Sequence, residues 1–108
     1  MWVFAETGFV SAVVHRDDPH TLIVRSRDRE SIEPLALLVN TDIVTGAGTD
    51  YPHRIECSRD HFTQWVEQNI ASMSYGNFKS RVTQTRGHDF AHALMDVWSA
   101  MCQVEDIR

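Results

Sequence analysis

Apolar and polar residues alternate along much of the first half of the chain, and this period of two predicts β-strands. The segment Thr21–Arg27 shows the pattern most clearly, because Leu22 and Val24 lie on one side of an extended chain and Arg25 and Arg27 on the other. Arginine side chains need water, so the second side is expected to face solvent. By the same pattern, strands are predicted at Trp2–Ala5, Phe9–Arg16, Thr21–Arg27, Asp42–Thr45 and Tyr51–Cys57.

The last of these strands extends the set of solvent-facing arginines. Within Tyr51–Cys57 the alternation places Arg54 on the outer side, where it joins Arg25 and Arg27 if the strands are neighbours. The residues predicted to face the core are Tyr51, His53, Ile55 and Cys57. The predicted outer positions offer no aromatic residue, so this face is not expected to stack nucleic-acid bases.

A helical period replaces the strand period in the second half of the chain. Ser58 is a suitable N-cap, and the apolar residues after it recur every three or four positions. They are Phe62, Trp65, Val66, Ile70 and Met73. The segment Asp89–Val104 is apolar on two adjacent stripes, which predicts a helix covered by two neighbours or one with a face left for a partner. A shorter helix is predicted at Asp28–Leu38, and two starts are open. Asp28 could cap it, but Pro34 would then lie beyond the first turn, whereas Ser31 as N-cap places Pro34 near the start.

Together these elements predict an α+β fold: an antiparallel sheet of four or five strands with the C-terminal helices packed on one face. The 108 residues suit a single domain, 1–108, with a frayed tail at 104–108. A hydrophobic fraction of 43% and a charged fraction of 23% fit a folded globular protein rather than a disordered chain.

The charge and hydropathy of the chain bear on its partners and location. A net charge of −5 argues against a general duplex-binding protein, because such proteins draw much of their affinity from neutralising phosphates. The longest apolar run, Leu35–Val39, is far shorter than a membrane span, and the N-terminus lacks a basic leader. We therefore expect no membrane interaction, a cytoplasmic location, and Cys57 and Cys102 as reduced thiols.

The stretch Ser74–His88, between the two long predicted helices, contains no carboxylate and carries three cations. Two interpretations are open. In one, it is a helical connector whose aromatic residues fill the core and whose cations face water. In the other, it docks a partner or an anionic group. The residues that would form this surface are Tyr75, Asn77, Lys79, Arg81 and Arg86.

Two histidines form the only metal-like spacing in the sequence. His88 and His92 are four residues apart and would share one helical face, which can hold a transition metal. No glutamate follows the first histidine and no third ligand is evident nearby, so capping or packing is the preferred interpretation. No nucleophile with a positioned base can be inferred from spacing. We therefore assign no metal site, cofactor or catalytic residue, and a metal-dependent enzyme at these histidines stays an alternative.

Several short motifs are spread across nearly the whole chain. They are Met1-Trp2, Gly8-Phe9, Val24-Arg25-x-Arg27, Asp50-Tyr51-x-x-Arg54, Tyr75-x-Asn77-Phe78-Lys79 and Val97-Trp98. In this combination the chain resembles a family of short proteins from bacteria, notably actinobacteria, and their phages. That family has no established activity, so the resemblance transfers no catalytic residue. It implies a cytoplasmic bacterial or phage-encoded setting, in which a small protein that binds a host factor is expected.

The sequence thus favours a small non-enzymatic interaction protein that binds a host or cellular protein. Its candidate surfaces are the segment 75–86 and the outer side of the last helix around Trp98, which could also form a homodimer. The alternative is a nucleic-acid or anion-binding module that uses Arg25, Arg27 and Arg54.

Overall fold

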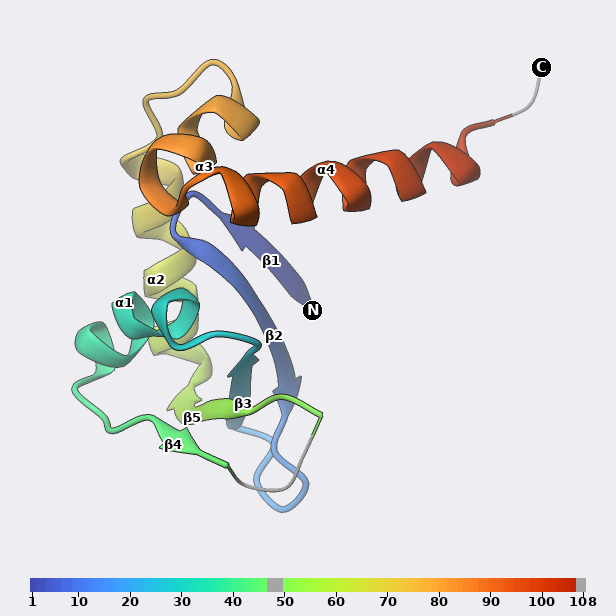
Figure 1. Ribbon diagram of the computed structural model, residues 1–108. Coiled ribbons are helices and arrows are strands. Elements are labelled where there is room, and N and C mark those ends of the chain that lie inside the picture. The colour runs from blue at the N-terminus through green and yellow to red at the C-terminus, as the bar shows by residue number, and fades with distance from the viewer. Residues whose placement is uncertain (47–49, 107–108) are drawn as a thin grey trace. The chain divides into compact units, whose positions relative to one another are not determined.

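The computed structural model describes residues 1–46 and 50–106, and their contacts divide the chain into two compact units, Met1–Met73 and Ser74–Arg108. The first unit contains five strands and two helices (Figure 1). These are β1 (Trp2–Ala5), β2 (Gly8–Val14), β3 (Thr21–Ser26), α1 (Arg29–Val39), β4 (Val44–Thr45), β5 (His53–Ser58) and α2 (Arg59–Ala71).

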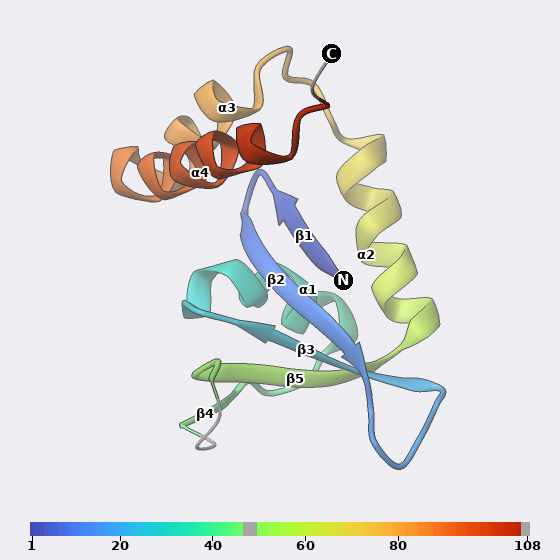
Figure 2. The same ribbon diagram turned by 90° about the vertical axis from the view of Figure 1, so that its right-hand side faces the viewer.

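The strands form one antiparallel sheet in the order β1-β2-β3-β5-β4, with β1 at an edge beside β2 (Figure 2). This confirms the predicted α+β fold with a five-strand antiparallel sheet. The bounds of four strands differ from the prediction. β2 covers Gly8–Val14, β3 ends at Ser26, β4 holds only Val44–Thr45, and β5 runs from His53 to Ser58 rather than from Tyr51 to Cys57. The later start of β5 matters for the site described below.

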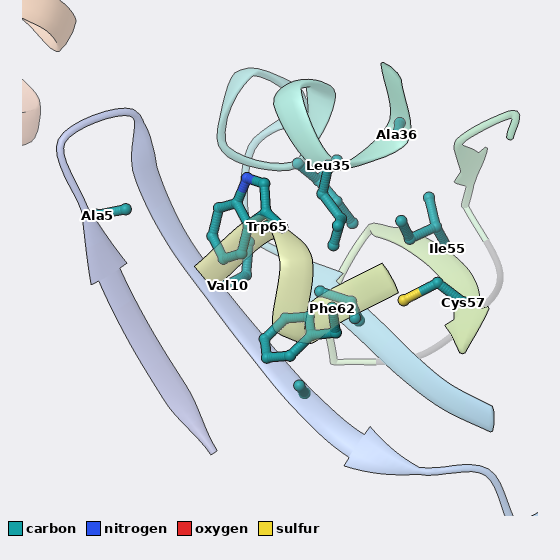
Figure 3. Close-up of a cluster of buried hydrophobic side chains, with 11 residues drawn as sticks. Ala5, Val10, Leu35, Ala36, Ile55, Cys57, Phe62 and Trp65 are labelled. Atoms are coloured by element: carbon teal, nitrogen blue, oxygen red, sulfur yellow. The ribbon is translucent and has the colours of Figure 1, made fainter. Parts of the chain in front are cut away.

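Helices α1 and α2 cover the same face of the sheet (Figure 1). Figure 3 shows the cluster that they bury, with Trp65 and Phe62 of α2 beside Leu35 of α1. The strand residues in this cluster are Ala5, Val10, Ala12, Val24, Ile55 and Cys57. They occupy alternate positions along their strands, so the residues between them face the opposite side. We call that opposite side the open face, because neither helix of the first unit covers it.

The start of α1 differs from the prediction. Asp28 is the N-cap and the helix begins at Arg29, so Pro34 lies inside it, where it cannot donate to the preceding turn. Ser31 has another role: its hydroxyl accepts from the backbone N–H of Phe9 at 3.1 Å and contacts the carboxylate of Asp28. The preference for Ser31 over Asp28 as the N-cap was wrong, because local sequence rules do not describe the long-range bond between Ser31 and β2.

The two cysteines occupy different environments, which predicts different reactivity. Burial raises the pKa of the Cys57 thiol above its ordinary value, whereas Cys102 is exposed. Because the thiolate is the nucleophile, iodoacetamide should alkylate Cys102 in the native protein and leave Cys57 almost unmodified. Peptide mass spectrometry measures the two sites, and both should react in denaturant. Equal rates in the native state would contradict the packing of Cys57.

The second unit contains α3 (Phe78–Arg86), α4 (His88–Met101) and the short 3₁₀ helix η1 (Cys102–Val104). Asn77 caps α3, and its side chain accepts from the N–H of Ser80 at 2.9 Å. Gly87 joins the two helices with a φ of 89°, a left-handed conformation that suits glycine. The helices pack against each other, and the buried apolar residues of this unit are Val82, Ala91 and Leu94. Of the predicted frayed tail, residues 107–108 lie outside the described residues.

Candidate anion-binding face

The sheet places Arg25 and Arg54 side by side. They are paired directly across β3 and β5, and their neighbours Val24 and Ile55 point into the core. Both arginines therefore lie on the open face, as the alternation predicts, and both are half-buried. Two like charges at directly opposed positions destabilise a sheet. The fold thus carries an electrostatic cost at this point.

Tyr51 gathers the third arginine into the same cluster. Its ring is 8% exposed and lies 4.7 Å from the guanidinium carbon of Arg25 and 4.3 Å from that of Arg27. Tyr51 is buried, as its predicted inward position requires, but its ring contacts Arg25 and Arg27 instead of joining the core cluster. Because β5 begins only at His53, the strand alternation does not extend back to Tyr51, which lies outside the core cluster.

Two hydrogen bonds fix the orientation of these arginines. Arg25 Nη2 donates to the hydroxyl of Ser11 at 3.0 Å, and Arg27 Nη1 donates to the backbone carbonyl of Asp50 at 2.6 Å. The second bond joins positions 23 apart in the chain. Each guanidinium has five N–H donors in a rigid plane, so each of these two bonds uses only one of the five. The cluster of Arg25, Arg27, Tyr51 and Arg54 is called the arginine–tyrosine cluster below.

Positive charge in this cluster is not balanced locally. Within residues 1–46 and 50–106, no carboxylate forms an ion pair with Arg25, Arg27 or Arg54. The Nε atoms of Arg25 and Arg54 are buried and have no hydrogen-bond partner among the described atoms. An unpaired positive site in a chain of net charge −5 favours an anionic ligand.

The open face also carries aromatic residues that the sequence analysis missed. Trp2 pairs with Ser11 and Phe4 with Phe9, so these aromatic side chains alternate with the core residues Ala5 and Val10. The prediction of an outer face without aromatic residues was therefore wrong. The alternation within Trp2–Ala5 could have predicted these outer aromatic residues. If Ala5 and Val3 face the core, Trp2 and Phe4 must face the other side of the strand.

In the second unit, two of the three cations of segment 75–86 contact aromatic rings. The ammonium of Lys79 lies 4.9 Å from the centre of the Trp98 ring, and the guanidinium carbon of Arg86 lies 4.1 Å from that of Phe90. Arg81 donates to the side chain of Gln84 at 3.3 Å. The cation–π contacts of Lys79 and Arg86 cover part of these two side chains, which are only partly exposed. The segment is therefore a helical connector, as the first interpretation has it, and it still presents partly exposed cations, as a docking surface would require.

A shallow hollow opens within this segment. It has a volume of about 270 Å³, and it is lined by Ser74, Tyr75, Gly76, Asn77, Ser80, Arg81 and Gln84. The rings of Tyr75 and Phe78 lie 5.7 Å apart beside it. The side-chain oxygen of Asn77 accepts the capping hydrogen bond of α3. Arg81 is the charged residue that lines this hollow and could contact an anion there.

The outer end of α4 is apolar and exposed. From Met95 to the end of the described chain every residue is exposed, and Trp98 keeps 60% of its accessible surface. The large apolar residues of this end are Met95, Val97, Trp98, Met101 and Val104. We call these five residues the α4 apolar end.

The histidine pair offers little support for a metal site. His88 is the first residue of α4, and both His88 and His92 are exposed. No cluster of three or more metal-ligating side chains forms among the residues described by the structure. In that same part of the chain, every helix is too short or too polar to cross a membrane.

The structure brings together two motifs that lie far apart in the sequence. Val24-Arg25-x-Arg27 runs along the end of β3, and Asp50-Tyr51-x-x-Arg54 folds against it, so Tyr51 contacts Arg25 and Arg27 while Arg54 pairs with Arg25. This convergence makes the arginine–tyrosine cluster the best-defined candidate site of the first unit. No protein-family model, no curated protein and no solved structure matches the chain.

Proposed function

We propose that this chain is a small, cytoplasmic, non-enzymatic binding protein whose arginine–tyrosine cluster holds a phosphate-bearing ligand. The observation that supports the proposal most is the direct opposition of Arg25 and Arg54, with no carboxylate paired to either among the described residues. Such a pair costs stability in the absence of a ligand. An anion bound between the two guanidiniums would offset their repulsion and accept charge-assisted hydrogen bonds from both.

The ring of Tyr51 prepares the site for this role. Cation–π contacts with the ring hold the guanidiniums of Arg25 and Arg27 close to Tyr51, and the N–H groups of a guanidinium donate in its plane. Ser11 and the Asp50 carbonyl fix one donor of each arginine. Side chains that are already ordered lose little entropy when a ligand binds, which favours affinity.

Calorimetric titration with inorganic pyrophosphate tests the proposal, with Arg54→Gln as the informative variant. The change removes one charge and keeps a polar side chain of similar reach. We expect affinity to fall about tenfold or more, because each lost bond to a charged group weakens binding by that order. The unfolding temperature should stay equal or rise slightly, since a like-charged pair is relieved.

Arg29→Gln is the matched control. Arg29 also belongs to the first unit, but it pairs with Glu33 at 3.3 Å on the surface of α1. Its loss should leave pyrophosphate affinity within about twofold, because exposed pairs contribute little. If wild-type protein does not bind pyrophosphate, or if both variants bind as the wild type does, the proposed function is wrong.

A second proposal keeps the interaction-protein hypothesis and rests on the α4 apolar end. Large apolar side chains grouped on an exposed helix surface are typical of protein contacts, and tryptophan is often a hot spot in them. We propose that this end of α4 pairs with a second copy of itself. Light scattering should then report twice the chain mass of 12.4 kDa at high concentration, and Trp98→Glu should restore the monomer. A wild-type monomer throughout would exclude this homodimer.

A further inference from the structure

A straight row of paired residues crosses the open face from an aromatic ring to the two arginines. Trp2 of β1 pairs with Ser11 of β2, Ser11 pairs with Arg25 of β3, and Arg25 pairs with Arg54 of β5. Directly paired residues share a face of the sheet. Since neighbouring strands lie about 4.8 Å apart, the backbone of Trp2 is roughly 10 Å from that of Arg25.

Trp2 presents a fixed flat surface at the start of this row. Its side chain is 66% exposed, and its ring meets the ring of Phe9 edge-on, at 5.5 Å and 84°. Phe9 stacks in turn on Phe4 at 4.6 Å. Backbone bonds at 2.8 Å and 2.9 Å between Met1 and Ala12 hold the strand end in place. Trp2 is therefore a supported ring with a face open to solvent rather than part of a frayed end.

The chemistry of the row matches one class of ligand. Bases stack on exposed aromatic rings, and guanidiniums bind phosphate oxygens in their plane. A nucleoside polyphosphate carries both groups, with a sugar between the base and the phosphate chain. Ser11 lies between Trp2 and Arg25 but is 2% exposed and accepts from Arg25, so it orients the arginine.

The distribution of charge favours a compact ligand over a nucleic-acid strand. Two guanidiniums, those of Arg25 and Arg27, contact one tyrosine ring, and Arg54 is paired with Arg25 on the next strand, which concentrates positive charge at one place. A single strand would need a basic track along its path. The remaining charge on the open face includes Glu56, which pairs with His15 at 3.3 Å, and the whole chain is acidic. Repulsion from this net charge is smaller for one compact ligand than for a long polyanion.

We propose that the open face binds a nucleoside di- or triphosphate, with its base against Trp2 and its phosphate chain at Arg25 and Arg54. This inference rests on the proposed function, because the arginine–tyrosine cluster supplies the phosphate site. The inference goes further in two respects: the ligand is a nucleotide, and Trp2 binds its base.

Parallel calorimetric titrations with ADP and inorganic pyrophosphate test the inference. We expect ADP to bind about tenfold more tightly, because stacking of one base on an aromatic ring contributes an effect of that order. Trp2→Ala should abolish this difference while leaving pyrophosphate affinity within about twofold. Trp2→Phe should retain part of it. Arg54→Gln should weaken both ligands alike.

Trp98→Ala is the matched control, because Trp98 is 60% exposed, close to the 66% of Trp2, but belongs to the second unit. It should leave both affinities unchanged, and circular dichroism establishes that each variant is folded. Equal binding of ADP and pyrophosphate, or an unaffected preference in Trp2→Ala, would overturn this inference and leave the proposed function standing. Absence of binding by both probes would overturn both. If affinity for oligothymidylate rose with the length of the oligonucleotide, the ligand of the open face would be a single nucleic-acid strand and the nucleotide proposal would be wrong.

Discussion

Replacing Leu35 by alanine should lower the free energy of unfolding of the first unit by about 3 kcal/mol, with a correspondingly lower midpoint in urea. Leu35 is 0% exposed and lies in the core cluster, beside Trp65 and Phe62 in Figure 3. The change removes buried methyl groups and leaves a cavity between α1 and the sheet. Both terms destabilise the folded state.

Leu37 provides a control of the same residue type on the same helix. It is 82% exposed, so Leu37→Ala should change the free energy of unfolding by no more than about 0.5 kcal/mol. Urea unfolding followed by circular dichroism measures both variants. A similar loss in the two, or a larger one in Leu37→Ala, would mean that α1 packs on the sheet with a different face.

Replacing Tyr51 by alanine should have the second-largest effect, and it should change stability and binding together. The side chain is 8% exposed and contacts both Arg25 and Arg27 through its ring. Its removal loses a buried aromatic group and two cation–π contacts, so we expect a loss of about 3 kcal/mol of stability. Pyrophosphate affinity should fall about tenfold, because the arginines lose the surface that orders them.

Tyr51→Phe separates the ring from the hydroxyl. The ring faces that contact the arginines are retained, so most of the stability and of the pyrophosphate affinity should remain. Urea unfolding and calorimetric titration of the same samples supply both readouts. If Tyr51→Ala lost stability but bound pyrophosphate as the wild type does, Tyr51 would be a packing residue without a role in the site.

Much of the fold follows from residue periodicity, because a strand or helix with one buried face must repeat its apolar positions. The alternation around Val24 and Ile55 correctly predicted which sides of β3 and β5 face the core. The helical stripe after Ser58 likewise placed Phe62 and Trp65 in contact with the sheet, and the Ser58 cap is confirmed by its bond to the His61 N–H at 3.1 Å.

The site was only partly predictable, since its contacts connect segments that are distant in the chain. Alternation assigns a face only inside a strand, and Tyr51 precedes β5, so nothing local indicated that its ring would contact Arg25 and Arg27. The same holds for Ser31, whose bond to Phe9 overrides a local capping role. Both errors arise from tertiary contacts that local rules do not describe.

The position of the bound anion is the central claim, and a nitrogen–proton correlation spectrum titrated with pyrophosphate tests it most directly. We predict that the backbone amide signals of Arg25, Tyr51 and Arg54 move, with saturation at the calorimetric affinity, while those of Lys79 and Arg81 stay in place. Movement confined to residues 75–86, or no movement at any position, would contradict the account.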